Sequence, residues 1–551
     1  MRMRIDLSKF NIKLVCSILL VIAAFYNAGA QVVWENPTKE IYSFLSRQAQ
    51  KGNIELYDHI QPYSRKEIAE KLAQLQGISD KLSPIEKSEL KFYQQEYAEF
   101  NSDQTDASSF LKRDQNNRLR FLSVRKGNFL LNGDPSIVLE GISGTGRSIF
   151  KLANGLQFWG HASKNISFQA GFVDITERGD GLDSTRTFNA EPGIVRTSNP
   201  NLNSLNYSDF RGNITYSWNN GSISMGQDQL LHGYGENGRI ILSDKAPAYP
   251  FIRLDYQPLK WLQFNYSHSW LQSGIIDSAA TYNKGNTIYG NIREQYVQKF
   301  MASHSLNFFP VKGLTLSLGE SVVYSDKLQI GYLFPLMFFK VYDQYASKYK
   351  ITTGSNAQFF FQASSRNHIK NTHFYATLFI DEIRMAEVFN SAKSRNQIGF
   401  NIGGSITDLL PYLTIGAEYT RLNPFVYQNL VPAQNYTNQN YPLGDWMGAN
   451  ADRILGYIKF TPVAKLKTTL LFQNTRKGDP GSLFDQYFAE PQPKFLANYH
   501  VQNTQLQFKV SYEWLNNLYL NATLMHQRDK YAATLPDQTF NEVRFGVRLG
   551  L

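Results

Sequence analysis

The sequence predicts an all-β transmembrane barrel, antiparallel and up-and-down with about 18 strands, preceded by a small N-terminal helical bundle. Three observations predict this fold: an export signal at the start, an alternating strand at the end, and no apolar segment long enough for a membrane helix. The final strand alternates arginine and glycine with the apolar residues Val543, Phe545, Val547, Leu549 and Leu551. A period of two places one face in lipid and the other in a polar lumen.

Residues 1–30 have the three parts of a secretory signal peptide. An apolar core over 14–26 follows basic residues, and the small residues 28–30 form the expected cleavage site. We therefore expect the mature chain to begin at Gln31. Because the only cysteine, Cys16, lies in the apolar core, we expect no disulfide, thiol nucleophile or thiolate metal site in the mature protein.

The composition favours membrane insertion by strands. The mean hydropathy is -0.36, while 32 Tyr, 38 Phe and 38 Gly suit the aromatic girdles and crowded strands of a barrel. The formal net charge of +10 could attract nucleic acid, but export makes that partner a poor interpretation. Outer-membrane lipid, anionic lipopolysaccharide, an anionic glycan or a basic lumen explain the charge better.

Residues 31–100 predict three short helices. The first begins with Asn36 as a cap and Pro37 at the first helical position, and the second begins at Ser64. The third begins at Ser83 with a capping box. A bundle of this size is too small to be stable alone, so we expect it to pack on the periplasmic mouth of the barrel. Residues 101–117 are interpreted as a polar linker.

From residue 118 to 551 the pattern is that of strands, such as 262–270 and 506–514, in which apolar and polar residues alternate. Short connections recur at 257–261, 309–313, 410–412, 461–465 and 515–517. Long connections recur at about 177–206, 272–296, 326–357, 384–395, 422–453 and 475–501. Because outer-membrane barrels have short periplasmic turns and long extracellular loops, we expect the long set to face outward.

The loop over 421–452 is the most informative about function, because it interleaves amides with aromatic rings. Planar amides and aromatic faces match the hydroxyls and C–H faces of a sugar. The candidate glycan contacts are Tyr427, Asn429, Tyr436, Asn438, Tyr441 and Trp446. The alternative interpretation is that the aromatics pack the loop and the amides satisfy its backbone.

Several segments resemble the Wzi-like outer-membrane proteins of capsule assembly, in the branch that includes a gliding-motility protein of Bacteroidetes. These segments are 62–65, the glycine-rich 232–243, 381–382, 418–427 and 441–452. The resemblance implies an 18-stranded barrel, a three-helix bundle at its periplasmic end, and loops that plug the outer side and bind exported capsular polysaccharide.

The chain departs from the pattern of that family in two places. Asp445 and Trp446 follow the Pro-Leu-Gly triplet, where the family commonly has a histidine, and the chain ends in Leu551, where barrels favour an aromatic residue. The first departure affects the identity of the ligand, and the second affects only the assembly signal.

An enzymatic function is poorly supported. Asp381 and Glu382 are neighbours on a predicted strand, so they point to opposite faces and cannot flank one glycosidic bond. The His-Ser pairs at 161–163 and 268–269 are no more frequent than chance allows. We expect no catalytic residue, metal or cofactor.

The sequence therefore predicts a non-enzymatic barrel in the outer membrane of a Gram-negative bacterium that binds surface or capsular polysaccharide through its extracellular loops. The first alternative is an accessory of gliding motility or surface adhesion that anchors protein partners, including an export or motility machine. The second alternative is a diffusion porin, which would have an open lumen.

Overall fold

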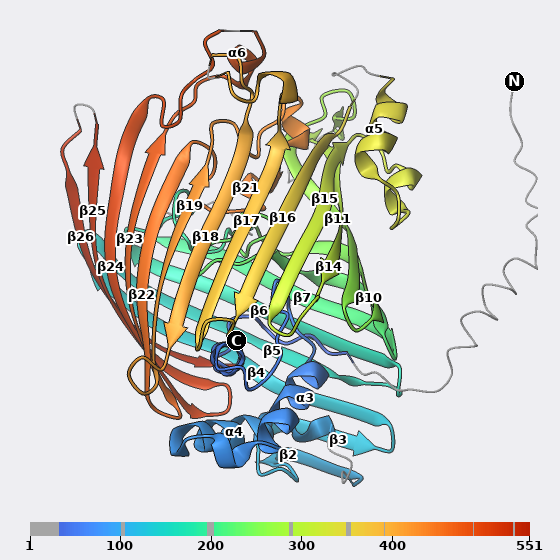
Figure 1. Ribbon diagram of the computed structural model, residues 1–551, viewed down its shortest axis with the longest axis vertical. Coiled ribbons are helices and arrows are strands. Elements are labelled where there is room, and N and C mark those ends of the chain that lie inside the picture. Colours follow the sequence, from blue (N-terminus) through green and yellow to red (C-terminus); the bar gives the residue numbers. More distant parts are fainter. Residues whose placement is uncertain are drawn as a thin grey trace, which may run out of the picture.

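The computed structural model describes residues 32–550, apart from 101–104, 196–202, 286–289, 349–353, 391, 489 and 533–534. The predicted signal peptide and Leu551 lie outside the described residues. Within them, eighteen antiparallel strands close into one barrel, so the predicted fold class is confirmed (Figure 1). The last strand closes the barrel by pairing with the first, with Phe545 opposite Gly141.

The barrel strands follow one another in chain order around the wall. They are β4 (Phe129–Gly144), β5 (Arg147–His161), β6 (Ile166–Asp180), β7 (Ser204–Trp218), β8 (Gly221–Asp228), β10 (Tyr249–Leu259), β11 (Leu262–Ile276), β14 (Tyr296–Phe308), β15 (Leu314–Ser325), β16 (Asn356–Arg366), β17 (Thr372–Glu382), β18 (Gln397–Thr407), β19 (Leu413–Leu422), β22 (Ala451–Val463), β23 (Leu466–Gly478), β24 (Tyr499–Leu515), β25 (Leu518–Tyr531) and β26 (Gln538–Leu549).

The two rims of the barrel differ in the length of their connections. The short turns are 162–165, 219–220, 260–261, 309–313, 367–371, 408–412, 464–465 and 516–517. The opposite rim carries the long loops and one tight turn at 145–146. The predicted short and long connections fall on opposite rims. The long loop 229–248 was not predicted, although it holds the glycine-rich segment noted in the sequence.

Helices α2 (Ile41–Gln50), α3 (Arg65–Gln76) and α4 (Pro84–Glu96) lie at the short-turn rim (Figure 1). Ser83 and Glu86 form the predicted capping box of α4, and Ser64 caps α3 by accepting the Glu67 N–H. The predicted start of the first helix was wrong: the side chain of Asn36 closes a turn onto Thr38, and α2 begins only at Ile41.

The remaining short elements lie in connections. They are β1 (Ile60–Gln61), β9 (Leu231–His232), β12 (Tyr282–Asn283), β13 (Ile292–Arg293), β20 (Thr437–Asn438), β21 (Tyr441–Pro442), α5 (Phe339–Ser347), α6 (Leu483–Phe488), and the 3-10 turns η2 (Ser79–Lys81), η3 (Ala98–Phe100), η4 (Ile330–Leu333), η6 (Met385–Glu387) and η7 (Pro432–Gln434). In the described part of the chain, no helix has both the length and the apolar character needed to cross a membrane.

The predicted linker over 101–117 is partly a strand. Residues Ala107–Arg113 form β2, which pairs antiparallel with β3 (Leu119–Lys126), and β3 in turn pairs with the start of β4. The rings of Phe110 and Phe121 meet edge to face at 5.0 Å across the hairpin. The sequence predicted a linker because residues 101–117 are mostly polar and lack the alternating apolar side chains by which a strand is recognised.

Buried ion pairs fix the helical bundle on the rim. The guanidinium of Arg65 contacts the carboxylates of Glu35, Glu96 and Glu99, at 2.5, 3.2 and 2.7 Å. Arg118, in the turn before β3, also pairs with Glu96 and extends the network to Asp134 on β4, at 3.3 Å. The carboxylate of Glu96 therefore pairs both with Arg65 of the bundle and with Arg118 at the start of the strands.

We expect Arg65→Met to destabilise the bundle by about 3–5 kcal/mol, because it leaves buried carboxylates without their cation. The measurement is the thermal unfolding of the detergent-folded protein, together with the protease sensitivity of residues 32–100. Lys66→Met is the matched control, because Lys66 lies on the same helix and its 3.8 Å pair with Glu70 is largely exposed to solvent. Equal effects of the two substitutions would contradict the role given to the network.

The same network predicts acid sensitivity. Burial alone would raise the pKa of Glu96, but Arg118 and Arg120 hold that pKa well below its usual range. Glu86 belongs to a second cluster, with Arg47 and Lys51 of α2 and its C-cap. Burial would raise its pKa too, but hydrogen bonds from Lys51 and from the Ser83 backbone lower that pKa to about 2. Depressed carboxylate pKa values stabilise the fold above the unfolded pKa, about 4.3 for glutamate, and this stabilisation is lost as pH falls through the folded values.

We therefore expect the bundle to detach as pH falls from about 4.3 towards 2, while the strand signal in circular dichroism persists. Proteolysis of residues 32–100 across this pH range, with an acid-active protease, measures the effect. Stability that is flat over the same window would contradict the assignment.

Candidate functional site

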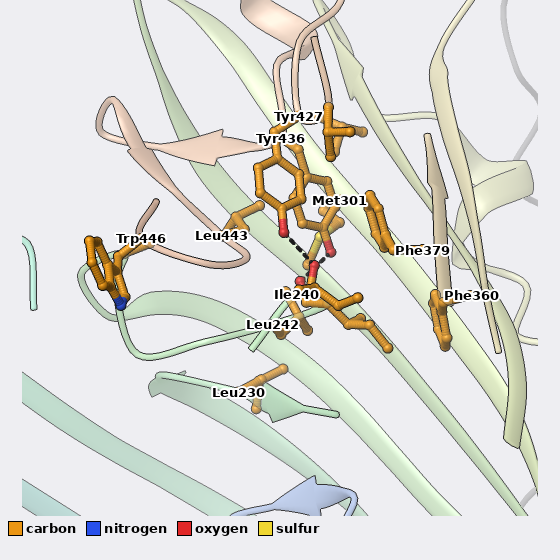
Figure 2. Close-up of a cluster of buried hydrophobic side chains, with 14 of the residues drawn as sticks. Leu230, Ile240, Leu242, Met301, Phe360, Phe379, Tyr427, Tyr436, Leu443 and Trp446 are labelled. Atoms are coloured by element: carbon orange, nitrogen blue, oxygen red, sulfur yellow. Dashed lines mark hydrogen bonds between the residues drawn. The ribbon is translucent and has the colours of Figure 1, made fainter. Parts of the chain in front are cut away.

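Two long loops fold into the lumen and are named here the plug: 229–248, between β8 and β10, and 423–450, between β19 and β22. Their apolar residues pack on lumen-facing side chains of the wall, including Met301, Phe360 and Phe379 (Figure 2). The first loop also meets the N-terminal segment, since β9 pairs with β1 and Gly233 N–H donates to the carbonyl of His59 at 2.7 Å. The plug is thus one packed core inside the barrel.

Two of the predicted glycan contacts hold the two loops of the plug together. The hydroxyl of Tyr427 donates to the carbonyl of Ile240 at 2.7 Å, and the hydroxyl of Tyr436 donates to the carbonyl of Ile241 at 3.0 Å (Figure 2). The two rings are stacked with centroids 5.5 Å apart. Both side chains are almost completely buried, at 3% and 0% exposure.

Asn438 and Trp446 have the same kind of role. The amide of Asn438 donates to the carbonyl of Pro247 at 3.1 Å and accepts the Gln272 N–H at 2.9 Å. The indole N–H of Trp446 donates to the carbonyl of Asn237 at 2.7 Å. These polar groups satisfy the backbone of irregular loops, which is the alternative interpretation given for this loop.

Asn429 and Tyr441 are the two predicted contacts that remain partly exposed. The side-chain oxygen of Asn429 accepts the Val431 N–H at 2.9 Å within its own loop. Tyr441 packs its ring beside Gly193 and under the ammonium of Lys245, 5.5 Å from the ring centroid. The six residues predicted from the sequence therefore belong to the plug rather than to one open surface, and glycan binding by them stays a prediction.

A buried charge cluster joins the plug to the wall. The guanidinium of Arg453 pairs with Asp445 at 2.9 Å and with Glu418 at 3.4 Å, and all three side chains are fully buried. Burial raises the pKa of Asp445, which the charge of Arg453 opposes. Asp445, the residue that departs from the family pattern, is thus part of an internal ion pair.

The plug leaves a space, named here the chamber, of about 930 Å³ between itself and the wall formed by β4–β7 and β22–β26. Trp446 and Asn237 of the plug border the chamber on one side, and Thr38 and Ser43, near the start of α2, border it on another. A volume near the top of the usual range for ligand pockets, about 300–1,000 Å³, admits a ligand of several rings.

Polar side chains dominate the part of the chamber formed by strands. Amides and hydroxyls include Gln473, Asn503, Gln505, Gln507, Thr469 and Thr523. Basic residues include Arg147, Lys151, Lys459, Lys509, Arg544 and Arg548. The sequence pattern predicted that several of these face the lumen, including Gln505, Gln507 and Arg544, but not that they border one cavity.

Two of the basic residues, Lys509 and Arg548, differ from the others because they have no carboxylate partner among the described residues. Lys459 pairs with Glu236, and Arg544 pairs with Glu191 at 2.8 Å. In the described part of the chain, neither Lys509 nor Arg548 has a carboxylate within salt-bridge distance, and the guanidinium of Arg548 instead lies over the ring of Tyr519. The chamber therefore has cationic groups free to meet a negative charge.

The neighbouring carboxylates of β17 contact different groups. Asp381 points into the lumen, where it accepts the N–H of Tyr427 at 2.6 Å and the amide of Gln358 at 3.1 Å. Glu382 instead accepts the hydroxyl of Tyr487 and pairs with Arg395 at 3.7 Å. Their arrangement is not that of a hydrolase pair.

A closed transmembrane barrel with an internal plug and a polar chamber defines the class of this protein. The model of the family named capsule assembly protein Wzi matches residues 201–542. Because this match covers more than half of the chain, the protein belongs to that family.

One solved structure supports the fold, and a second is more distantly similar. The barrel of Wzi from Escherichia coli, described as a carbohydrate-binding outer-membrane protein involved in group 1 capsule assembly, is similar with a TM-score of 0.56. It is 13% identical, and the match covers 95% of this chain and all of that one. Pseudomonas aeruginosa OprD is 10% identical with a TM-score of 0.42, covering 81% and 98%. No curated protein sequence matches the chain significantly.

We expect Tyr427→Phe and Tyr436→Phe each to destabilise the plug by about 1 kcal/mol, because each leaves a buried carbonyl without its donor. Thermal unfolding in detergent measures the change. Tyr441→Phe is the control, since no hydrogen bond from the Tyr441 hydroxyl is found among the described residues. A loss for Tyr441→Phe as large as for the other two would contradict this account.

Proposed function

We propose that this protein lies in the outer membrane of a Gram-negative bacterium, binds surface or capsular polysaccharide, and helps to assemble or retain it at the cell surface. Membership of the capsule assembly family supports this function. So does the described carbohydrate binding of the E. coli barrel, which shares the fold. The protein has no catalytic role in this proposal.

The observation that carries the proposal is the chemistry of the chamber. Amides and hydroxyls such as Gln505, Gln507 and Thr523 can donate and accept hydrogen bonds with sugar hydroxyls. The ring of Trp446 meets that of Phe188 edge to face at 5.5 Å where both border the chamber, and aromatic faces suit the C–H faces of a sugar. Of the six contacts predicted from the sequence, only Trp446 lines this chamber.

The chamber is bordered by carboxylates, such as Glu140 and Asp209, as well as by basic residues, and the two basic residues without a carboxylate partner indicate which glycan it favours. Lys509 and Arg548 face the cavity without a carboxylate partner in the described residues, so a uronic acid or another acidic substituent would supply one. In this proposal the ligand is an acidic polysaccharide segment, bound between the plug and the wall.

The alternatives have less support. A diffusion porin needs an open lumen, whereas the plug fills one side of this barrel and the helical bundle lies over one end. An accessory that anchors protein partners would use exposed apolar residues of the long-loop rim, and Phe389, Phe484 and Phe488 have this character. Loss of surface spreading with normal capsule in a deletion strain would favour that reading.

Direct binding tests the proposal. The detergent-folded protein is titrated with polysaccharide released from its own cells, and Lys509→Gln is compared with the unchanged protein. We expect affinity to fall on the order of tenfold or more, because a hydrogen bond to a charged group is worth about 1.5–3 kcal/mol.

Lys530→Gln is the matched control, because it makes the same charge change on β25 outside the chamber. Trp446→Ala tests the aromatic border separately. Saturable binding that neither Lys509→Gln nor Trp446→Ala weakens would place the site elsewhere, for example on the outer loops. No binding at millimolar sugar would remove the polysaccharide function.

A further inference from the structure

One long loop does not extend away from the rim. Residues 327–348, between β15 and β16, contain η4 and α5, and they lie against the outer surface of the barrel (Figure 1). We name this segment the flap. Its buried residues Tyr332 and Phe339 pack with Phe300, Val322 and Tyr324 of the wall.

Strand alternation shows that the wall residues under the flap point outward, away from the lumen. On β15, Val323 packs in the plug core, so Val322 and Tyr324 point to the opposite face of the sheet. Likewise on β14, Met301 belongs to the plug core, which places Phe300 on the outside. The flap therefore covers the face that the rest of the barrel turns towards lipid.

The wall under the flap has an unusual polar character. Glu320 of β15 and His304 of β14 stand directly opposite each other and share this outward face. An uncovered carboxylate on the lipid face of a barrel is destabilising, because the hydrocarbon core offers it no hydrogen-bond donor. The flap supplies the missing partners.

The flap satisfies both groups with its own backbone. The carboxylate of Glu320 accepts the N–H groups of Phe339 and Lys340 at the start of α5, at 2.5 and 3.4 Å, and pairs with His304 at 3.1 Å. The Nδ1 atom of His304 lies 2.9 Å from the carbonyl of Pro335. A carboxylate at a helix N-terminus is also stabilised by the helix dipole.

The opposite side of the flap is apolar and exposed. Its outward residues are Ile330, Phe334, Leu336, Phe338, Val341 and Tyr345, of which Ile330 and Tyr345 are more than 80% exposed. This surface continues the lipid-facing surface of the wall, where Leu316 and Leu318 of β15 are also exposed. An apolar surface of this extent is unfavourable in water.

The residues opposite Glu320 on neighbouring strands indicate how far along the barrel axis, relative to the membrane, the flap lies. Glu320 stands opposite Phe359 of β16, and Phe359 stands opposite Ile380 of β17, so the row that contains Glu320 continues as an apolar row. The ring of Phe338 in the flap lies 6.1 Å from that of Phe359. The flap thus occupies the place that acyl chains occupy on the neighbouring strands.

We propose that the flap is embedded in the outer leaflet of the membrane, with its exposed apolar side chains among lipid acyl chains. It is an outer-leaflet lipid-contact element and not a loop in water. This surface is independent of the chamber and of the proposed polysaccharide function, and Glu320 is the group that fixes it to the wall.

Site-directed fluorescence tests the proposal on the complete protein in bilayers. Ile330→Cys and Tyr345→Cys are each made in the mature chain beginning at Gln31, which has no other cysteine, and each receives an environment-sensitive fluorophore. Phe545→Cys, on the lipid face of β26, is the reference for lipid contact, and Phe389→Cys, which is 99% exposed on another long loop, is the reference for water. Lipids brominated on the acyl chain and aqueous iodide are the two quenchers.

We expect brominated lipid to quench the flap labels as strongly as the label at 545, while iodide quenches them much less than the label at 389. Iodide quenching equal to that at 389 would overturn the proposal. A second outcome would also overturn the proposal: labels that neither quencher reaches, but that become accessible when the protein is diluted in the bilayer. That result would show that the flap contacts a second copy of the protein. The labelled positions are mostly exposed, so we expect these variants to leave the packing of the flap on the wall intact.

A second variant tests the anchor. With the label at 345, Glu320→Leu removes the acceptor of the helix N–H groups, and we expect acyl-chain quenching at that position to fall and label mobility to rise. Glu320→Gln keeps an acceptor oxygen and should retain most of the quenching. Equal quenching in all three proteins would contradict the anchoring role of Glu320.

Discussion

The structure depends on one constraint: irregular backbone inside a membrane barrel needs a hydrogen-bond partner for each buried polar group. The wall satisfies its own backbone through strand pairing, but the two plug loops have no such ladder. Side chains provide the partners, as when Tyr427 and Tyr436 reach the carbonyls of Ile240 and Ile241. The aromatic and amide residues of the loop over 421–452 are therefore mainly the internal bonding of the plug.

The plug fills one side of the lumen and leaves the other side open as the chamber. The hydrophobic cluster of the plug lies against β10, β11 and β14–β17, while β4–β7 and β22–β26 keep their polar residues towards the chamber. Arg453, with Asp445 and Glu418, stands where the two parts meet and is fully buried. Packing on one side of the barrel thus leaves a polar cavity on the other side.

Local patterns in the sequence predicted the wall and two helix starts, because alternation, turn residues and the Ser83–Glu86 capping box act over a few residues. Burial of Tyr436 could not be predicted in this way, since it depends on Ile241, far away in the chain. The strand at 107–113 was missed for a different reason: its partner β3 follows directly in the chain, but the residues Ala107–Arg113 show no regular alternation of apolar and polar side chains. His268 did give a signal: a polar residue on a predicted lipid face indicates that something covers it, and here it bonds Tyr324 beside the flap.

The pairing of β1 with β9 has a structural consequence. The carbonyl of His59 accepts the Gly233 N–H, and Arg366 of the wall binds Asp58 beside it. Loop 229–248 starts and ends at one rim, while β1 lies between helices α2 and α3 of the bundle at the other rim, so the loop and the bundle segment meet within the barrel. A continuous path of backbone contacts therefore connects the long-loop rim, through loop 229–248, to the N-terminal segment that forms the bundle at the opposite rim.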